Sequence, residues 1–209
     1  MKLYEFEAQL NNKLISIENP RPFVCDGNPL ESRIFIVGFN AATEMKAQFW
    51  DFWSVETGFN KKKWFDAYVQ ERALKPLKPG KTRRNKVSNT RQRIEWILSE
   101  ITDFKCLETN LYMTATTEAK ELNKNLMDAS VFNFLLESIK PKFLLIHGAD
   151  AKTHMELLTN IELKLGEFNT ASINGARVII YPVSHLSRGW SKQKCFDLGK
   201  ALQIEASGE

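Results

Sequence analysis

Two short, continuous apolar segments constrain the fold of this chain most strongly. Ile34–Phe39 has the sequence IFIVGF, and Phe143–His147 has the sequence FLLIH and is followed by Gly148. Apolar runs of this length without alternation are typical of strands that are buried on both faces, as in a parallel sheet. The chain is therefore expected to fold around a parallel sheet that helices cover on both sides.

The rest of the sequence supplies the other elements of an α/β fold. Lys105–Tyr112 predicts a further strand, and Asn174-Gly175 between two β-like runs predicts a hairpin. Ser88-Asn89-Thr90 can cap a helix whose apolar face has helical spacing. The expected helices are Phe49–Tyr68, the capped helix with Ile94, Ile97, Leu98 and Ile101, Lys124–Ser138, Ala149–Leu158 and Ser191–Ile204; the hairpin strands are Phe168–Ile173 and Arg177–Tyr181. Alternating strands and helices favour a mostly parallel sheet.

Length and composition place the chain among globular proteins. Its 209 residues fit a single domain of residues 1–209, and 43% hydrophobic residues are enough for a core. The sequence contains no run of roughly 18 apolar residues, so we expect no membrane span, and the charged N-terminus does not resemble a signal peptide. The cysteines, Cys25, Cys106 and Cys195, have neither disulfide-framework nor metal-site spacing. A cytoplasmic protein without a metal or cofactor is expected.

Positive charge is concentrated in one segment. Residues 72–94 contain nine basic and no acidic side chains, whereas the other 186 residues contain 20 basic and 25 acidic ones. Because Pro76, Pro79 and Gly80 break helices, we expect most of this segment to be a loop, within a basic insertion at about residues 61–93. Such a loop suits a phosphate-backbone partner, with Arg83 and Arg84 as candidate contacts, but a solvated surface loop is the alternative interpretation.

Three segments should converge at the carboxyl ends of the strands, where ligands of parallel sheets bind: Gly38–Thr43, Glu108–Tyr112 and Pro182–Arg188. His147 lies at the edge of this crevice. The common phosphate-loop, dinucleotide and serine-hydrolase motifs are absent. Neutral polar side chains and nearby aromatic rings remain, and these suit a flat heterocycle such as a nucleobase.

Several motifs resemble the uracil-DNA glycosylase superfamily, most closely its mismatch-specific and thymine-DNA glycosylase branch. The order of the motifs along the chain, from about Arg33 to Leu202, also agrees with that family. The matching segments are Gly38-Phe39-Asn40-Ala41-Ala42, Phe49-Trp50, Thr109-Asn110-Leu111-Tyr112 with Thr116-Thr117 and Glu121-Leu122, Phe143–Gly148, and Ser184-His185-Leu186-Ser187-Arg188. The resemblance implies a three-layer α/β/α sandwich around a mostly parallel four-stranded sheet.

The resemblance also implies site residues. Asn40 would position the attacking water, Gly38 and Phe39 would line the base pocket, and Asn110 would lie near the extruded base. Phe49 would stack on that base, although an aromatic residue at helical spacing is often core. Ser184, Ser187 and Arg188 would contact DNA, with Leu186 and Arg188 forming a wedge in the base stack. The alternatives are turn roles for Asn40 and Asn110, and ordinary surface positions for the loop residues.

The sequence also departs from the family pattern. Ala41 replaces a proline, Pro182 stands where classical members have a catalytic histidine, and His185 stands where glycine or proline is usual. His185 either donates to the base or a phosphate, or merely packs. The resemblance implies a monomeric, monofunctional DNA glycosylase acting on a damaged, mismatched or modified pyrimidine in double-stranded DNA. Alternatives are a phage-defence enzyme that excises glucosylated hydroxymethylcytosine, an inactive DNA-binding module, and a nucleoside or nucleotide hydrolase.

Overall fold

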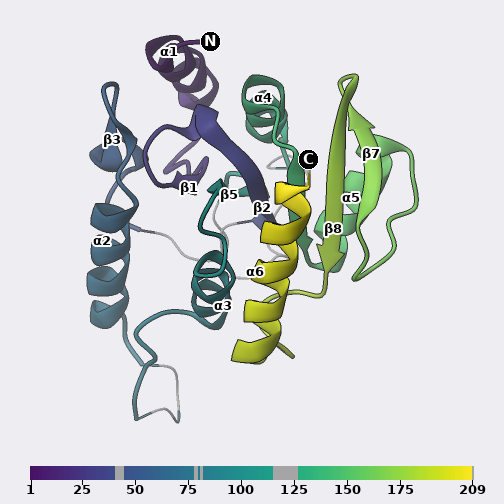
Figure 1. The fold of residues 1–209 in the computed structure, drawn as a ribbon. Helices are drawn as coiled ribbons and strands as arrows, with labels where there is room; N and C mark the ends of the chain where they lie inside the picture. The colour runs from purple at the N-terminus through teal and green to yellow at the C-terminus, as the bar shows by residue number, and fades with distance from the viewer. Residues whose placement is uncertain (41–44, 78–79, 81, 115–126, 209) are drawn as a thin grey trace.

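The computed structural model describes residues 1–40, 45–77, 80, 82–114 and 127–208. In this part of the chain a mixed sheet of six strands has the order β1-β5-β2-β6-β8-β7 (Figure 1). The strands are β1 (Val24–Cys25), β2 (Ser32–Asn40), β5 (Lys105–Tyr112), β6 (Phe143–His147), β7 (Asn169–Ile173) and β8 (Ala176–Val183). The inner four strands are parallel, and β1 and β7 pair antiparallel at the two edges.

This arrangement confirms an α/β fold with a mostly parallel sheet, but the expected count of four strands is wrong. The hairpin strand β7 extends one edge, and β1, which is too short to give a sequence pattern, extends the other. The hairpin itself is confirmed: Asn174 and Gly175 both have positive φ angles, of 51° and 76°, as a two-residue turn of this kind requires.

Side chains of the central strands are buried on both faces, which explains their continuous apolar sequences. Phe35 and Val37 of β2 and Leu144 of β6 belong to the larger core cluster, while Ile36 of β2 and Leu145 of β6 belong to the second. Successive residues alternate between faces, so each strand contributes to both clusters.

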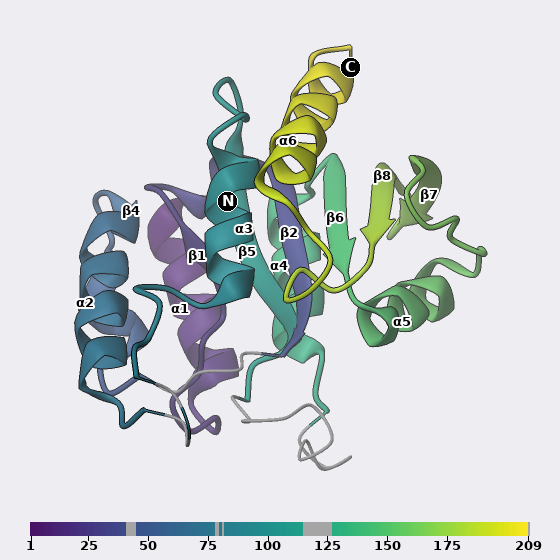
Figure 2. The same ribbon diagram turned by 90° about the horizontal axis from the view of Figure 1, so that it is seen from below.

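Helices cover both faces of the sheet. The helices are α1 (Leu3–Leu14), α2 (Lys61–Leu74), α3 (Asn89–Leu98), α4 (Ser130–Ile139), α5 (Ala149–Thr159) and α6 (Lys192–Ser207). Buried residues of α1, α4 and α5 form the larger cluster with the sheet, whereas α3 and α6 form the second cluster on the other face (Figure 2). Within the described residues, no helix has the length and apolar character of a membrane span.

Helices α3 and α6 approach each other closely at Gly199. A Cβ atom at this position would collide with the backbone carbonyl oxygen of Ile97. The two helix backbones can therefore pack at this distance only because residue 199 has no side chain. This contact makes α3 and α6 a tightly packed pair.

Most predicted helices are confirmed, although their first and last residues differ from the predicted ones. Ser88 caps α3, its Oγ accepting a hydrogen bond from the backbone N–H of Arg91 at 3.1 Å. Helices α5 and α6 lie within a few residues of their predicted bounds. Helix α4 begins at Ser130 rather than Lys124, and residues 124–126 lie outside the described part of the chain. It ends at Lys140, which adopts a left-handed conformation before Pro141.

Of the two predictions for the middle of the chain, one is wrong and one is confirmed. Phe49–Tyr68 is not one helix: a short 3-10 turn (Phe49–Phe52) and a hairpin of β3 (Trp53–Ser54) and β4 (Gly58–Phe59) precede α2. The prediction that residues 72–94 are mostly loop is confirmed: α2 ends at Leu74, α3 begins at Asn89, and the described residues between them form no helix or strand. Upstream of this loop, α2 buries Trp64 and Tyr68 in the larger core cluster. The aromatic residues pack in tertiary contacts here and do not follow one helical stripe.

Candidate functional site

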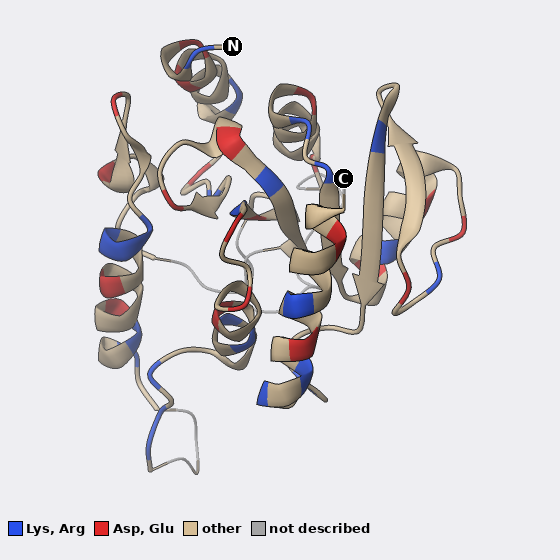
Figure 3. Ribbon diagram, in the orientation of Figure 1, with Lys and Arg blue, Asp and Glu red and all other residues tan. Residues whose placement is uncertain are grey.

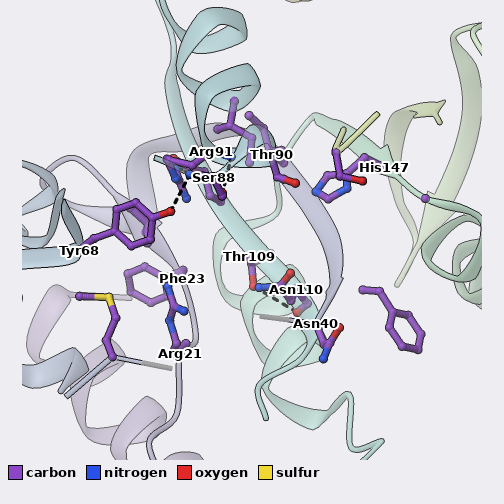
Figure 4. A pocket seen from close by; sticks show the side chains of 18 of the residues that line it. Arg21, Phe23, Asn40, Tyr68, Ser88, Thr90, Arg91, Thr109, Asn110 and His147 are labelled. Atoms are coloured by element: carbon purple, nitrogen blue, oxygen red, sulfur yellow. Dashed lines mark hydrogen bonds and ion pairs between the residues drawn. The ribbon is translucent and has the colours of Figure 1, made fainter. Parts of the chain in front are cut away.

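A cavity of about 700 Å³ lies at the carboxyl ends of the parallel strands (Figure 4). Its lining comes from the ends of β2, β5 and β6, the loop after β8, helices α2 and α3, and the segment before β1. Parallel strands bring their carboxyl ends to the same edge of a sheet, so residues distant in sequence meet there.

Four neutral polar side chains line the part of the cavity at the strand ends, which we call the mouth: Asn40, Asn110, His147 and His185. Asn40 and Asn110 end or nearly end the adjacent strands β2 and β5. Gly38 lies beneath the mouth, and a Cβ atom there would be 2.6 Å from Asn110 Oδ1 and 3.0 Å from His147 Nε2. Gly38 therefore leaves the space that the Asn110 and His147 side chains occupy.

His147 is a neutral group at the mouth. The residue is only 6% exposed, and burial lowers the pKa of its imidazole from 6.5 to about 3. Its Nδ1 atom is buried and has no hydrogen-bond partner among the described residues. A neutral imidazole has one donor and one acceptor nitrogen, so Nδ1 of His147 is a polar atom whose hydrogen-bonding capacity the described residues leave unused.

His185 has a defined hydrogen-bonding orientation. Its Nδ1 accepts a hydrogen bond from the backbone N–H of Ser187 at 3.1 Å and lies 2.8 Å from Ser187 Oγ. Because Nδ1 accepts, the neutral ring carries its proton on Nε2. Burial and the charge of Arg188 lower the pKa of His185, which favours this neutral form. The His147 and His185 rings meet edge to face, with centroids 5.1 Å apart.

The loop that carries His185 is held by α3. Arg93 donates from Nη1 to the Leu186 carbonyl oxygen at 2.6 Å and from Nε to the Trp190 carbonyl oxygen at 3.1 Å. Trp190 in turn donates from Nε1 to Ser184 Oγ at 3.1 Å. Leu186 is fully buried in the second core cluster, which contradicts its predicted role as a wedge.

A second part of the cavity lining is charged. Arg21, Arg91 and Glu108 form what we call the charged wall. Arg91 Nη1 pairs with Glu108 Oε2, and Lys61 Nζ lies 3.2 Å from Glu108 Oε1. Glu95 joins both cations, at 3.0 Å from Arg91 and 3.4 Å from Lys61.

Within the wall, Arg91 and Glu108 are compensated by each other and by the neighbouring Lys61 and Glu95. Burial alone would raise the pKa of Glu108, but Arg91 and Lys61 outweigh it and lower that pKa. Burial and the nearby Arg91 lower the pKa of Arg21 to about 10, so both guanidinium groups remain cationic at neutral pH. The wall therefore presents donors and a carboxylate side by side.

Aromatic and hydroxyl groups surround the charged wall. The Arg91 guanidinium lies 4.7 Å from the centroid of the Trp64 ring, which stacks on Tyr68 with centroids 5.6 Å apart. The Tyr68 hydroxyl accepts from the backbone N–H of Ser88 at 3.0 Å (Figure 4). Phe49 lines the cavity and is also packed in the core, where it stacks on Phe59. Its position therefore agrees in part with a residue of the pocket and in part with an ordinary core aromatic.

Figure 3 shows the Lys and Arg positions of the basic segment along α2, α3 and the loop between them. Some of these side chains have partners within the protein, and others are exposed. Arg91 and Arg93 are engaged in the cavity wall and the loop clamp. Arg84 donates to the carbonyl oxygens of Arg72 and Pro76, so it fastens the loop instead of serving as a free phosphate contact. Arg83 is exposed.

The structure brings most of the predicted site together. Residues that line the same cavity are Phe39, Asn40, Phe49, Asn110, His185, Ser187 and Arg188. Ser184 and Arg83 are exposed but are not among the lining residues. Ala41, Ala42, Thr116, Thr117, Glu121 and Leu122, which carried parts of the motifs, lie outside the described residues.

The charged wall was not predicted from the sequence, and His147 was expected only at the edge of the crevice. Arg91 was counted as surface charge, although its place in a helix with buried Ile94 and Ile97 indicated an inward-facing neighbour. Glu108 stands inside a predicted strand, two residues before Asn110 and thus on the same face of the sheet, and this was a usable signal for a carboxylate at the site.

The described residues include neither a metal-binding cluster nor a thiol with a lowered pKa. Among the described residues, no cluster of His, Cys, Asp and Glu could hold a metal ion. Cys25, Cys106 and Cys195 are free, and burial raises the pKa of each thiol, to about 12 for Cys106. No protein-family model and no curated protein matches this sequence.

Proposed function

We propose that this chain is a monofunctional DNA glycosylase that flips a damaged, mismatched or modified pyrimidine out of DNA and hydrolyses its N-glycosidic bond. The observation that carries the proposal is the mouth of the cavity. There, Asn40, Asn110 and His185, three of the residues expected from the glycosylase-like motifs, line one concave site with aromatic rings and neutral hydrogen-bonding groups. A flat, polar heterocycle fits such a lining.

The chemistry assigns different roles to the mouth residues. Cleavage of the N-glycosidic bond leaves positive charge on the sugar and negative charge on the departing base. Asn110 and the Nε2–H of His185 can donate to that base, and fixed donors at a developing anion lower the barrier. Asn40 holds the water whose oxygen bonds to the sugar carbon and whose proton then passes to solvent. The base leaves with the bonding electrons and takes up a proton from solvent.

The surroundings of the mouth suit an extended polyanion. Arg188 and Ser184 are exposed on the loop that Arg93 clamps, and Arg83 and Lys86 are exposed in the basic loop. Basic side chains at the rim of a concave site can hold phosphates while a nucleotide is extruded. With Leu186 buried, Arg188 remains the candidate to fill the vacated stack.

The test is base release from duplex DNA with single uracil, thymine opposite guanine, hypoxanthine or 5-hydroxymethylcytosine sites, followed by alkali. We expect alkali-dependent cleavage at one base, reduced about 10²-fold by Asn40→Ala, because misplacing a reactant such as the attacking water costs on that scale. Asn12→Ala, at an exposed position of α1, is the matched control and should retain full activity.

Two outcomes would contradict the proposal. DNA binding without release from any base would assign the chain to a catalytically inactive binding module. Hydrolysis of free nucleosides without action on DNA would assign it to a nucleoside hydrolase.

A further inference from the structure

Two carboxylates line the cavity among the described residues, those of Glu108 and Asp150. Glu108 is paired with Arg91 and Lys61, and its side chain is only 7% exposed. Asp150 is exposed, and among the described residues no hydrogen bond or ion pair engages its carboxylate. Asp150 is therefore the carboxylate of the described lining that is available to a bound substrate.

The position of Asp150 follows from the topology of the sheet. Strands β2 and β6 are parallel neighbours, with Val37 opposite Ile146, so Asn40 and Gly148 lie toward the same edge of the sheet. Helix α5 begins directly after Gly148, carries Asp150 in its first turn, and contacts β2 as well as β6. Asp150 and Asn40 thus line the cavity from the ends of adjacent strands.

Gly148 brings the first turn of α5 close to the loop that carries His185. Its φ angle is 103°, and a Cβ atom at this position would lie 3.2 Å from Cδ2 of His185. Its N–H donates to the Val183 carbonyl oxygen at 3.0 Å, which joins the ends of β6 and β8. A side chain at residue 148 would crowd the imidazole, so glycine permits this approach of α5 to the mouth.

Ring contacts place the same face of α5 against the ends of β2 and β5. His154 stands four residues after Asp150, and residues at this spacing share one face of a helix. The His154 ring meets Tyr112 edge to face, with centroids 6.1 Å apart, and Tyr112 meets Phe39 in the same way at 5.1 Å. The face that carries Asp150 therefore lies over these strand ends.

The charge of Asp150 acts on both sides of the mouth. Burial and the negative charge of Asp150 raise the pKa of Tyr112, which is opposite Asn40 in the pairing of β5 with β2. Burial and Arg188 lower the pKa of His185, and Asp150 opposes them. The carboxylate is thus close to the end of β5 and to the loop after β8, and β2 and β6 lie between these two.

The reaction proposed for this cavity has a use for a carboxylate on its sugar side. Positive charge develops on the sugar as the N-glycosidic bond breaks, and the attacking water must lose a proton. The neutral amide of Asn40 can orient a water but cannot take its proton. A carboxylate close to both groups can accept that proton and stabilise the positive charge.

We propose that Asp150 is a catalytic residue of the glycosylase reaction, with its carboxylate facing the sugar and the water that Asn40 holds. This inference rests on the proposed function. The water oxygen bonds to the sugar carbon, and the N-glycosidic bond breaks with its electrons leaving on the base. The proton of the water passes to the Asp150 carboxylate and from there to solvent.

The experiment measures single-turnover base release and DNA affinity for Asp150→Asn, which keeps the shape of the side chain. We expect release to slow at least about 10²-fold, the scale of general-base catalysis. DNA should bind at least as tightly as to the wild type, because a negative charge that faces a polyanion is removed. An unchanged release rate would overturn the assignment.

A matched control separates this effect from a general loss of charge. Asp197→Asn removes the same charge at an exposed position of α6 that does not line the cavity, and it should retain the full rate. Asp150 is exposed, so Asp150→Asn should fold as the wild type does, which urea denaturation of both variants checks. An equal loss of rate in the two variants would contradict a specific role of Asp150.

A double variant tests whether Asp150 and Asn40 act on the same water. If they do, Asn40→Ala with Asp150→Asn should be slowed far less than the product of the two single effects, as is found for groups that act as a unit. Effects that multiply in full would contradict the shared water.

Failure of this inference can be told from failure of the proposed function. If the wild type releases no base from any of the duplexes, the glycosylase function itself fails. If the wild type releases a base and Asp150→Asn releases it at the same rate, only the role of Asp150 is refuted.

Discussion

The mouth and the charged wall belong to one cavity but differ in how their polar groups are satisfied. At the mouth, His147 is held neutral and has a buried nitrogen without a partner among the described residues. At the wall, Arg91, Glu108, Lys61 and Glu95 satisfy one another through ion pairs. The mouth therefore retains unused hydrogen-bonding capacity, whereas the polar groups of the wall are part of what stabilises the fold.

The largest effect on stability is expected from breaking the wall at one residue. Glu108→Gln leaves the buried Arg91 and Lys61 with less compensation, and should lower the free energy of unfolding by about 3–5 kcal/mol, measured by urea denaturation. The double variant Arg91→Gln with Glu108→Gln should recover part of this loss. A single variant as stable as the wild type would show that the wall has no structural role.

Gly38→Ala should perturb the mouth. The added methyl group would be 2.6 Å from Asn110 Oδ1 and 3.0 Å from His147, so these side chains or the strand must move. We expect a loss of about 1–3 kcal/mol in stability, the usual scale of overpacking, together with impaired base release. Unaltered activity in a stable variant would show that the positions of Asn110 and His147 do not matter for the reaction.

His147 should make stability sensitive to acid. Its pKa is about 3 when folded and 6.5 ordinarily, so between these values the unfolded chain binds the additional proton. Stability should therefore fall as pH drops from about 6.5 to about 3, with a contribution of about 1.4 kcal/mol per pH unit. His147→Asn should show a correspondingly flatter profile; parallel profiles for the two proteins would refute the buried neutral imidazole.

The smallest effect is expected at the loop clamp. Arg93→Gln removes charge-assisted hydrogen bonds to the carbonyl oxygens of Leu186 and Trp190. We expect a stability loss of about 1–2 kcal/mol, since the hydrogen bonds involve a charged group, and a higher KM for DNA with little change in kcat. A fall in kcat at constant KM would instead place Arg93 close to the chemical step.

The central strands were predictable because strands that are buried on both faces have continuous apolar sequences. Ile34–Phe39 and Phe143–His147 are both strands of the sheet, and Asn174-Gly175 turns the hairpin. The two-residue strand β1 was not predictable, because its pairing with β5 is a tertiary contact without a periodic signal. Helix α1 was missed although Phe6, Leu10 and Leu14 have helical spacing.

The residues of the mouth could be predicted from the sequence because they lie at or near the ends of recognisable strands. The charged wall was not, because Arg21, Arg91 and Glu108 come from separate parts of the chain and their pairing is decided by packing. Counting the charge of residues 72–94 as a surface property also concealed it, since Arg84, Arg91 and Arg93 bond to the protein itself.

The close packing of α3 against α6 at Gly199 has a consequence for ligand selection. Helix α3 carries Arg91 of the charged wall and Arg93 of the loop clamp, so one rigid element fixes the positions of both ends of the cavity. A ligand that contacts both ends at once must therefore fit a separation that the packing of α3 against α6 sets.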